Sequence, residues 1–344
     1  MKKNSILFLT SILFSLLIAE IGLRLSPYKF KRSEFSHFAI MQITPNFLFI
    51  YDKDLGWKLG NAGVYKVGVK SFPYYKITVD SLGNRTTGYN SKYAKPQIHL
   101  YGCSFTFGQS VNDTLSYPFQ LQKKMPAFEI RNKGINGYSL LQMFLALKKD
   151  VEKGQVPKVA VFNYANFHNE RSPLGKNWIR GRNFNLKFQE KNKYRQNNFN
   201  YPFAIIDKNG NLCVKYMSNE HWPQDFWLRD KLYLMDLLNS VFDKIWDKAN
   251  ESYLEEISFR LTSEIKKYCL KHCIKLIFTG MDKKSEVFLG KIAINGIDTL
   301  FFNVNIKDPN MNCQPTDPNH PSPKAHKIYA QKLFDFLVLH KVNL

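Results

Sequence analysis

Short apolar runs alternate with longer segments of helical periodicity through the last two thirds of the chain. The apolar runs predict strands at residues 97–101, 158–162, 274–279 and 299–304, and residues 129–132 form a further short predicted strand. Apolar residues at helical spacing predict helices at residues 117–125, 140–153, 226–250, 254–272 and 323–339. Strands of about five residues that alternate with helices of about twelve indicate parallel βαβ units. The pattern therefore predicts a three-layer α/β/α sandwich with a mainly parallel sheet over residues 95–344, with ligands at the carboxyl ends of the strands.

Two segments depart from this alternation. Residues 33–93 are rich in aromatic residues, glycine and asparagine and contain strand-like pieces such as residues 74–79. We therefore expect residues 26–94 to form a strand-rich extension that packs on the core. Residues 172–225 carry no clear period, which predicts an insertion at about 172–260 near the active edge of the sheet.

The N-terminus holds the longest apolar run of the chain. Residues 6–25 are apolar except for Glu20 and Arg24, and two lysines precede them. The run reaches the length that a bilayer requires, and no small-x-small cleavage site follows it. An uncleaved membrane anchor at residues 1–25 is the favoured interpretation, with a cleaved signal or a buried amphipathic helix as alternatives. Either of the first two places the rest of the chain outside the cytoplasm, on the periplasmic or cell-surface side, although the basic residues just beyond the run oppose that orientation.

Composition and charge limit what kind of protein this chain can be and which partners it can bind. The 344 residues are 44% hydrophobic and 15% aromatic, which excludes a disordered chain. The 49 Lys and Arg residues against 28 Asp and Glu give a net charge of +21, which attracts polyanions such as acidic glycans or anionic lipid heads. The charge is not accompanied by a nucleic-acid-binding module, so we expect no nucleic-acid partner. Five scattered cysteines favour neither a disulfide scaffold nor a zinc site, and the sequence predicts no metal and no cofactor.

Two short motifs could carry chemistry at the edge of the predicted sheet. Ser104 directly follows the first core strand, where a strand-to-helix turn would expose its hydroxyl. Asp317 precedes His320 by three residues, in a predicted loop that enters the last helix. A carboxylate at that spacing can bind imidazole Nδ1 and leave Nε2 free to take a proton from a serine. Each motif alone is common in ordinary turns and caps, but both fall at predicted sheet ends.

These residues match a known family pattern. The chain resembles the SGNH, or GDSL-type, hydrolase superfamily, whose first block Gly-Asp-Ser-x-Thr-x-Gly is matched by residues 102–108 with Cys103 in place of the aspartate. Its last block, Asp-x-x-His, is matched by Asp317 and His320. Residues 132–137 fit the second block, Asn-x-Gly-x-x-Gly, whereas residues 163–168 fit the third block, Gly-x-Asn-Asp, only at Asn166. With the apolar N-terminus, residues 54–57 resemble a membrane-linked branch of the superfamily.

The resemblance implies a flavodoxin-like fold and a catalytic serine. Ser104 would attack a carbonyl carbon, with His320 as its base and Asp317 as the group that orients the histidine. The oxyanion-hole donors would be the amides of Ser104 and Gly137 and the side chain of Asn166. If Asn166 does not serve, His168 is the nearest substitute.

Basic residues are dense between residues 171 and 195. Arg171, Arg180 and Arg182 are the candidate substrate-binding residues of a cap that attracts an anionic glycan or lipid head, although a solvated face explains the same cluster. The function that the sequence favours is a serine esterase or deacylase acting on an ester of a cell-envelope glycan or lipid. An O-acyltransferase that moves an acyl group to a sugar hydroxyl, and a non-catalytic glycan-binding protein on a hydrolase fold, are the alternatives.

Overall fold

The described residues of the computed structural model divide into two compact units. The description covers residues 2–28, 41–45, 48–69, 74–91, 93–175, 178, 200–218, 228–229 and 231–339. One unit comprises Met1–Ala39, Lys176–Arg195 and His221–Tyr253, and the other comprises Ile40–Gly175, Gln196–Glu220 and Leu254–Leu344.

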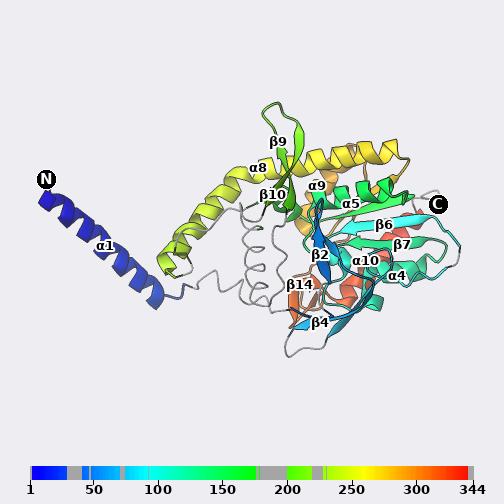
Figure 1. Ribbon diagram of the computed structural model, residues 1–344, viewed down its shortest axis with the longest axis horizontal. Helices are drawn as coiled ribbons and strands as arrows, with labels where there is room; N and C mark the ends of the chain where they lie inside the picture. Colours follow the sequence, from blue (N-terminus) through cyan, green and yellow to red (C-terminus); the bar gives the residue numbers. More distant parts are fainter. Residues whose placement is uncertain are drawn as a thin grey trace. The chain divides into compact units, whose positions relative to one another are not determined.

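A five-stranded parallel sheet forms the centre of the larger unit (Figure 1). Its strands lie in the order β12-β11-β8-β6-β7, which is the flavodoxin-like order 2-1-3-4-5 read from the other edge. Their bounds are β6 Gln97–Gly102, β7 Glu129–Gly134, β8 Val159–Tyr164, β11 Lys275–Gly280 and β12 Asp298–Phe301. Every residue of β8 is buried, as expected for a strand covered on both faces. The predicted α/β class with a parallel sheet is confirmed.

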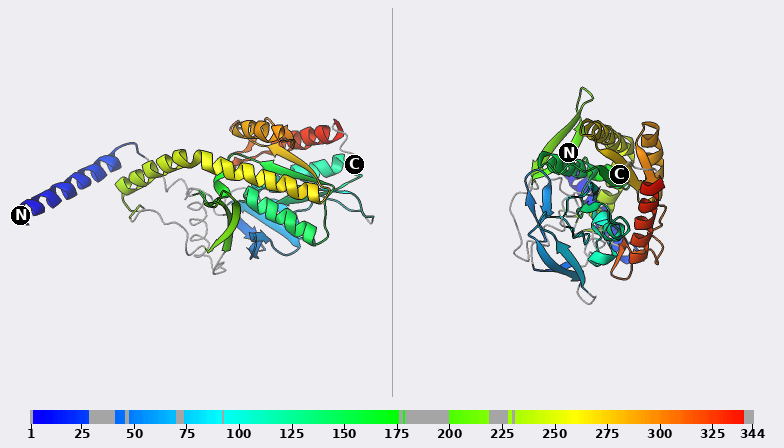
Figure 2. Two further views of the ribbon diagram at one scale, coloured as in Figure 1. Left: turned by 90° about the horizontal axis from the view of Figure 1, so that it is seen from above. Right: turned by 90° about the vertical axis from the view of Figure 1, so that its right-hand side faces the viewer.

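Right-handed crossovers distribute the helices over the two faces of this sheet. Helix α4 (Tyr117–Lys124) connects β6 to its outer neighbour β7, whereas α5 (Leu140–Glu152) connects β7 back to β8, so the two helices cover opposite faces. Helix α10 (Pro323–Leu339) packs beside α4, and Phe144 of α5 contacts Tyr268 of α8 (Tyr233–Lys271) at 5.7 Å between ring centroids. Helix α9 (Lys283–Ile294) packs beside β11 and β12. Figure 2 shows helices on both sides of the sheet.

Helix α8 differs from the sequence-based prediction. We predict separate helices over residues 226–250 and 254–272, but the structure has one continuous helix from Tyr233 to Lys271. The residues between the two predicted helices, 250–253, include neither proline nor glycine, so nothing in the backbone chemistry ends the helix there.

Short antiparallel strands precede the central sheet. Strands β1 (Met41–Thr44), β4 (Gly63–Val69) and β5 (Tyr75–Val79) form one small sheet, and β2 (Phe49–Asp52) pairs with β3 (Gly56–Leu59). Their apolar side chains form a second core cluster that includes Phe107 from the turn after β6 and Tyr138 from the segment after β7. A further hairpin, β9 (Asn200–Ile206) with β10 (Leu212–Ser218), lies in the segment predicted to be an insertion. The domain boundaries given above remain predictions.

The smaller unit contains the apolar N-terminal helix, α1 (Lys2–Leu25). Its segment Asn4–Leu25 has 22 residues with a hydropathy of 2.3 and is long and apolar enough to cross a membrane. Large side chains such as Leu7, Phe14 and Leu17 are more than half exposed, so the helix does not form part of a buried core.

Candidate active site

Ser104 begins a single helical turn directly after β6. This turn, α3 (Ser104–Phe107), packs so closely on the sheet that a Cβ on Gly134 would collide with the backbone of Thr106 and Phe107. A Cβ on Gly102 would collide with the side chain of Thr106. Glycine at both positions therefore permits the turn that places Ser104 at the carboxyl end of the central strand.

Ser104, His320 and Asp317 form a continuous hydrogen-bonded chain. His320 Nε2 lies 2.9 Å from Ser104 Oγ, and His320 Nδ1 lies 2.7 Å from Asp317 Oδ1. Because a carboxylate accepts the proton on Nδ1, Nε2 carries the lone pair that faces the serine hydroxyl. Ser104 is 6% exposed, and the side chain of His320 is 14% exposed. The structure thus brings together the three residues that we predict to be catalytic.

Asp317 and His320 lie on a short strand rather than in the predicted loop. Strand β14 (Asp317–Pro321) pairs with β13 (Asn312–Cys313), and α10 begins two residues beyond its end. The Ser322 hydroxyl accepts a hydrogen bond from the Ala325 amide at 3.4 Å, as an N-cap serine does. The strand and the cap hold the two residues at a fixed distance from α3.

The second oxygen of Asp317 has partners that the sequence analysis missed. Ser110 Oγ donates to Asp317 Oδ2 at 2.6 Å, and Gln109 Nε2 donates to the same oxygen at 2.9 Å. Asn136 Nδ2 in turn donates to Gln109 Oε1 at 2.7 Å. Burial alone would raise the pKa of Asp317, but the hydrogen bonds that it accepts from His320, Ser110 and Gln109 lower it from its ordinary value, as does the charge that His320 carries when protonated. Asp317 is therefore held as a carboxylate, the form that orients the histidine.

A fully buried arginine fixes the end of the serine turn. Arg85 Nε pairs with Asp113 Oδ1 at 2.9 Å, and Asp113 lies in the 3-10 helix Asp113–Leu115. The same guanidinium donates to the carbonyl oxygens of Phe107, Gly108 and Val111. These carbonyls end the turn, so a buried cation satisfies acceptors that would otherwise lack partners. The sequence offered no local signal for this contact, because Arg85 lies in the N-terminal extension.

The proposed oxyanion donors lie on loops that follow β7 and β8. Gly137 has φ +81°, a conformation that favours glycine, and the neighbouring Asn136 binds Gln109 beside the triad. Asn166 is half-buried, and its backbone amide donates to Asp282 Oδ2 at 2.9 Å. His168 is fully buried in the short helix α6 (His168–Arg171) and accepts the Ala165 amide at Nδ1. The oxyanion assignment of these residues remains a prediction.

Arg171 makes its contacts within the protein. Its guanidinium lies 4.0 Å from the ring centroid of Phe167 and donates to the Tyr138 carbonyl at 3.3 Å. It also hydrogen-bonds Cys103, which is buried directly before Ser104. Arg180 and Arg182 lie outside the described residues, so the substrate-binding role of the three arginines stays a prediction.

Comparisons with known proteins add structural likeness only. The chain matches no family model and no curated protein. Several solved structures are similar to this chain, and GDSL-type hydrolases are among them.

A GDSL-like lipase from Bacteroides thetaiotaomicron is 12% identical, with 74% of this chain and 94% of that chain covered and a TM-score of 0.39. The psychrotrophic esterase EstA from Pseudoalteromonas is 10% identical over 73% of this chain and all of its own, also at 0.39. The protein TesA is 11% identical over 70% of this chain and 98% of its own, at 0.39. Identities and scores of this size carry no conclusion about activity.

Three of the four residues that the sequence analysis missed lie beside a matched motif. Gln109 and Ser110 follow Gly108 directly, so they lie next to the serine motif and could have been singled out by position. Asn136 lies next to Gly137 in the second motif. Polar side chains immediately beside a matched motif are thus a usable signal, whereas Arg85, which lies 19 positions before Ser104, offers none of this kind.

Proposed function

We propose that this protein is a serine ester hydrolase of the SGNH type that works through an acyl-enzyme. The observation that supports the proposal is the chain from Ser104 Oγ through His320 to Asp317, with both hydrogen bonds within 3 Å. A serine, a base and an orienting carboxylate in this order are the parts that nucleophilic acyl transfer requires.

The mechanism follows from the direction of these hydrogen bonds. Ser104 Oγ attacks the ester carbonyl carbon while its proton passes to His320 Nε2. Asp317 stabilises the resulting imidazolium, and the amides of Ser104 and Gly137 with the side chain of Asn166 would stabilise the oxyanion. When the intermediate collapses, the alcohol leaves with the proton from His320. Water then attacks the acyl-enzyme, gives up a proton to His320, and releases the acid and free Ser104.

The proposed substrate is an ester of a cell-envelope glycan or lipid. Two features support it: the apolar helix α1, which would hold the protein at a membrane, and the positive net charge of +21, which would attract anionic polymers or headgroups. We further propose that the catalytic residues act outside the cytoplasm. A reporter enzyme that is active only outside the cytoplasm, fused to the C-terminus, should be active, whereas activity of a cytoplasm-only reporter would reverse this assignment.

Labelling of the full chain by a fluorophosphonate probe tests the catalytic proposal. The probe esterifies only an activated serine, so we expect one label on the unmodified protein and none on Ser104→Ala. Ser81→Ala is the matched control, because Ser81 is exposed in the turn after β5 and should leave labelling unchanged. If the unmodified protein is folded but does not react, the catalytic proposal is wrong and a binding role on the same fold takes its place.

A second measurement separates hydrolysis from acyl transfer. The acyl-enzyme formed from an activated ester should yield free acid in water at a rate that added sugar alcohols do not change. If sugar alcohols take over most of the acyl group at concentrations far below that of water, the protein is a transferase rather than a hydrolase.

A further inference from the structure

The first half of α8 has its polar and apolar faces reversed with respect to a helix of a soluble protein. Its polar side chains at helical spacing are buried: Asp236, Asn239, Ser240 and Asp243 are each at most 6% exposed. Its apolar side chains at the same spacing lie outside: Leu238, Val241, Phe242 and Ile245 are 47, 46, 43 and 64% exposed. We name these four side chains the α8 apolar face. Soluble helices bury the apolar stripe and expose the polar one, so this face is suited to an apolar environment rather than to water.

The buried polar face is satisfied by groups of the same unit. Asp236 pairs with Arg229 at 2.9 Å and accepts a hydrogen bond from the Tyr28 hydroxyl at 3.0 Å. Asn239 Nδ2 donates to Asp243 Oδ2 at 2.8 Å. Because exposing these groups would give up their hydrogen bonds, the helix cannot simply rotate and bury its apolar face instead.

The start of α8 is joined to the end of α1. The Glu20 carboxylate accepts the amide hydrogens of Tyr233 at 3.1 Å and Leu234 at 2.8 Å, which caps the first turn of α8. Arg24 pairs with Glu20 at 2.8 Å and donates to the Lys231 carbonyl at 3.1 Å. Both views show α8 leading away from the end of α1 rather than folding back along it (Figures 1 and 2).

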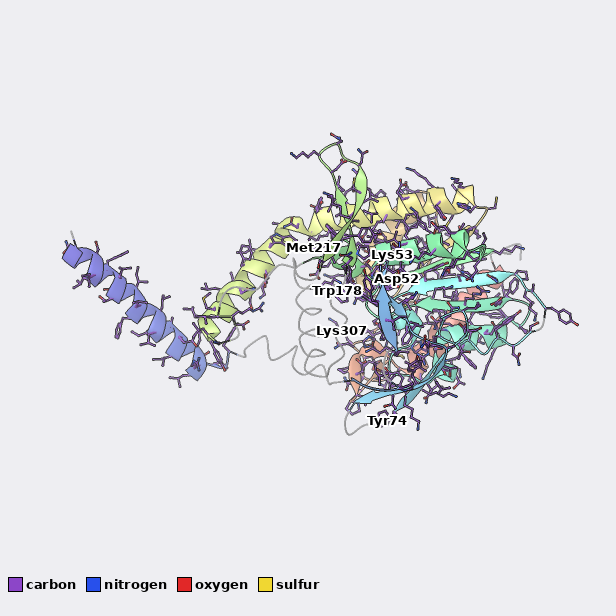
Figure 3. The ribbon with its side chains drawn as sticks, viewed as in Figure 1. Asp52, Lys53, Tyr74, Trp178, Met217 and Lys307 are labelled. Atoms are coloured by element: carbon purple, nitrogen blue, oxygen red, sulfur yellow. The ribbon has the colours of Figure 1, made fainter. Side chains whose placement is uncertain are left out.

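This junction ties the position of the start of α8 to that of α1. The apolar side chains of α1 project from it on all sides (Figure 3), and its apolar run ends where Glu20 and Arg24 begin to hold α8. If α1 spans the bilayer, that end lies at the boundary between hydrocarbon and headgroups. The first turns of α8 would then lie at the same boundary, with Leu238 about 10 Å or less from the junction at a rise of 1.5 Å per residue. Ile245 is about 18 Å along the helix by the same rise, so it reaches the boundary when this part of α8 runs along the membrane surface.

We propose that the α8 apolar face lies in the headgroup–acyl boundary of the membrane that α1 enters. The exposed lysines 231, 244 and 248 on the same stretch would face lipid headgroups, with a preference for anionic ones. A bilayer fits better than a second copy of this chain, because the Glu20 junction joins the start of α8 directly to the exposed apolar helix α1. The proposal rests on the membrane anchoring proposed above.

Depth-dependent fluorescence quenching in nanodiscs tests the proposal on the full chain. In a Cys213→Ser, Cys273→Ser background the remaining cysteines are buried, so single added cysteines can carry an environment-sensitive probe. Leu238→Cys and Ile245→Cys report the α8 apolar face, Leu13→Cys reports α1, and Ile294→Cys, 88% exposed in its native form, is the aqueous control. The nanodiscs contain phosphatidylcholine and phosphatidylglycerol, with nitroxide lipids labelled at shallow or deep positions.

We expect the probes at 238 and 245 to lose fluorescence with shallow nitroxide lipids and to resist iodide in the water. The probe at 13 should respond to deep nitroxides, and the probe at 294 only to iodide. Quenching at 13 without quenching at 238 and 245 would overturn the interfacial role of α8 and leave the anchor intact. Absence of quenching at 13 would overturn the anchor, and the interfacial proposal with it. Protection at 238 and 245 from both quenchers would mean that another protein copy covers the face, which also overturns the proposal.

Discussion

Two hydrogen-bonded chains, each made of an aspartate, a histidine and a hydroxyl side chain, lie along the same strand, β6. Only one of them has the features of a catalytic site. Near the start of β6, His99 Nδ1 lies 3.0 Å from the Tyr101 hydroxyl, which donates to Asp150 Oδ2 at 2.7 Å. Just past its end, Ser104 contacts His320, which contacts Asp317. The residue types are nearly the same, so composition does not separate the two chains.

The degree of burial distinguishes the two hydrogen-bonded chains. His99 is completely buried, and burial lowers its pKa to about 4, so it stays neutral at neutral pH and cannot store a proton. Burial also raises the pKa of Tyr101 well above its ordinary value, so its hydroxyl is a poor nucleophile. In the other chain the histidine is partly exposed, and the hydroxyl lies at the carboxyl end of the strand. An Asp–His–hydroxyl chain thus becomes a candidate for catalysis only where a substrate can reach it.

Replacing the aspartate of each hydrogen-bonded chain by asparagine should give the largest difference between the two chains. Asp317→Asn removes the charge that fixes the histidine tautomer, which in serine triads lowers kcat about 10⁴-fold. Asp150→Asn leaves Lys133, which pairs with Asp150 at 2.8 Å, as an uncompensated buried charge. We expect it to cost about 3–5 kcal/mol of unfolding free energy.

Turnover of an activated ester and urea unfolding measure the two effects. Asp317→Asn should unfold at nearly the same urea concentration as the unmodified protein, and folded Asp150→Asn should keep its turnover. If Asp150→Asn lost turnover while remaining folded, the two chains would not be functionally distinct.

Acid should destabilise the protein through His99. The pKa of His99 is lowered from 6.5 to about 4 by burial, so the unfolded chain binds a proton there at a higher pH than the folded one. Stability is therefore full above about pH 6.5 and falls as the pH drops towards 4, by roughly 3 kcal/mol for a shift of this size. Urea unfolding at pH 7 and pH 4 should show this loss, and His99→Gln should lose less by about that amount. Parallel losses in the two proteins would contradict the assignment.

Removing the Tyr101 hydroxyl from the buried chain should affect stability and leave turnover unchanged. Tyr101→Phe deprives the buried Asp150 of a donor, which should lower the free energy of unfolding by about 1–3 kcal/mol while turnover per folded molecule is unchanged. Thermal unfolding and initial rates on the same preparation measure both quantities. A loss of turnover in Tyr101→Phe beyond the loss of folded protein would show that the buried chain reaches the active site.

The smallest effect on turnover is expected from removing the hydrogen bonds to Asp317 Oδ2. Ser110→Ala removes the 2.6 Å hydrogen bond to this carboxylate, and Gln109→Met removes the 2.9 Å one. Each should lower kcat about tenfold, the value of one hydrogen bond to a charged group, and leave KM nearly unchanged. The acid limb of the pH–rate profile should also move to higher pH, because these bonds help to lower the pKa of Asp317. Changes confined to KM would show that these residues bind substrate instead of positioning Asp317.

Most secondary-structure elements and the three residues of the proposed triad could be predicted from the amino-acid sequence. The pattern of the sequence located the five strands of the parallel sheet within a few residues, most securely β6, β8 and β11, because strands buried on both faces are mostly apolar. The residues that the SGNH pattern singles out, Ser104, Asp317 and His320, are also those that the fold brings within hydrogen-bond distance. Local chemistry suffices for such features, since a turn, a cap and an Asp-x-x-His spacing are encoded in a few adjacent residues.

Which of these residues contact one another, and which are buried, depends on the folded chain. Arg85 clamps the serine turn from 19 positions away in sequence, and Gln109 reaches Asp317 across 208 positions. The burial that keeps His99 neutral depends on neighbours from distant segments of the chain, and so does the outward position of the α8 apolar face. Burial and long-range hydrogen bonds are properties of the folded chain, so no window of sequence contains them.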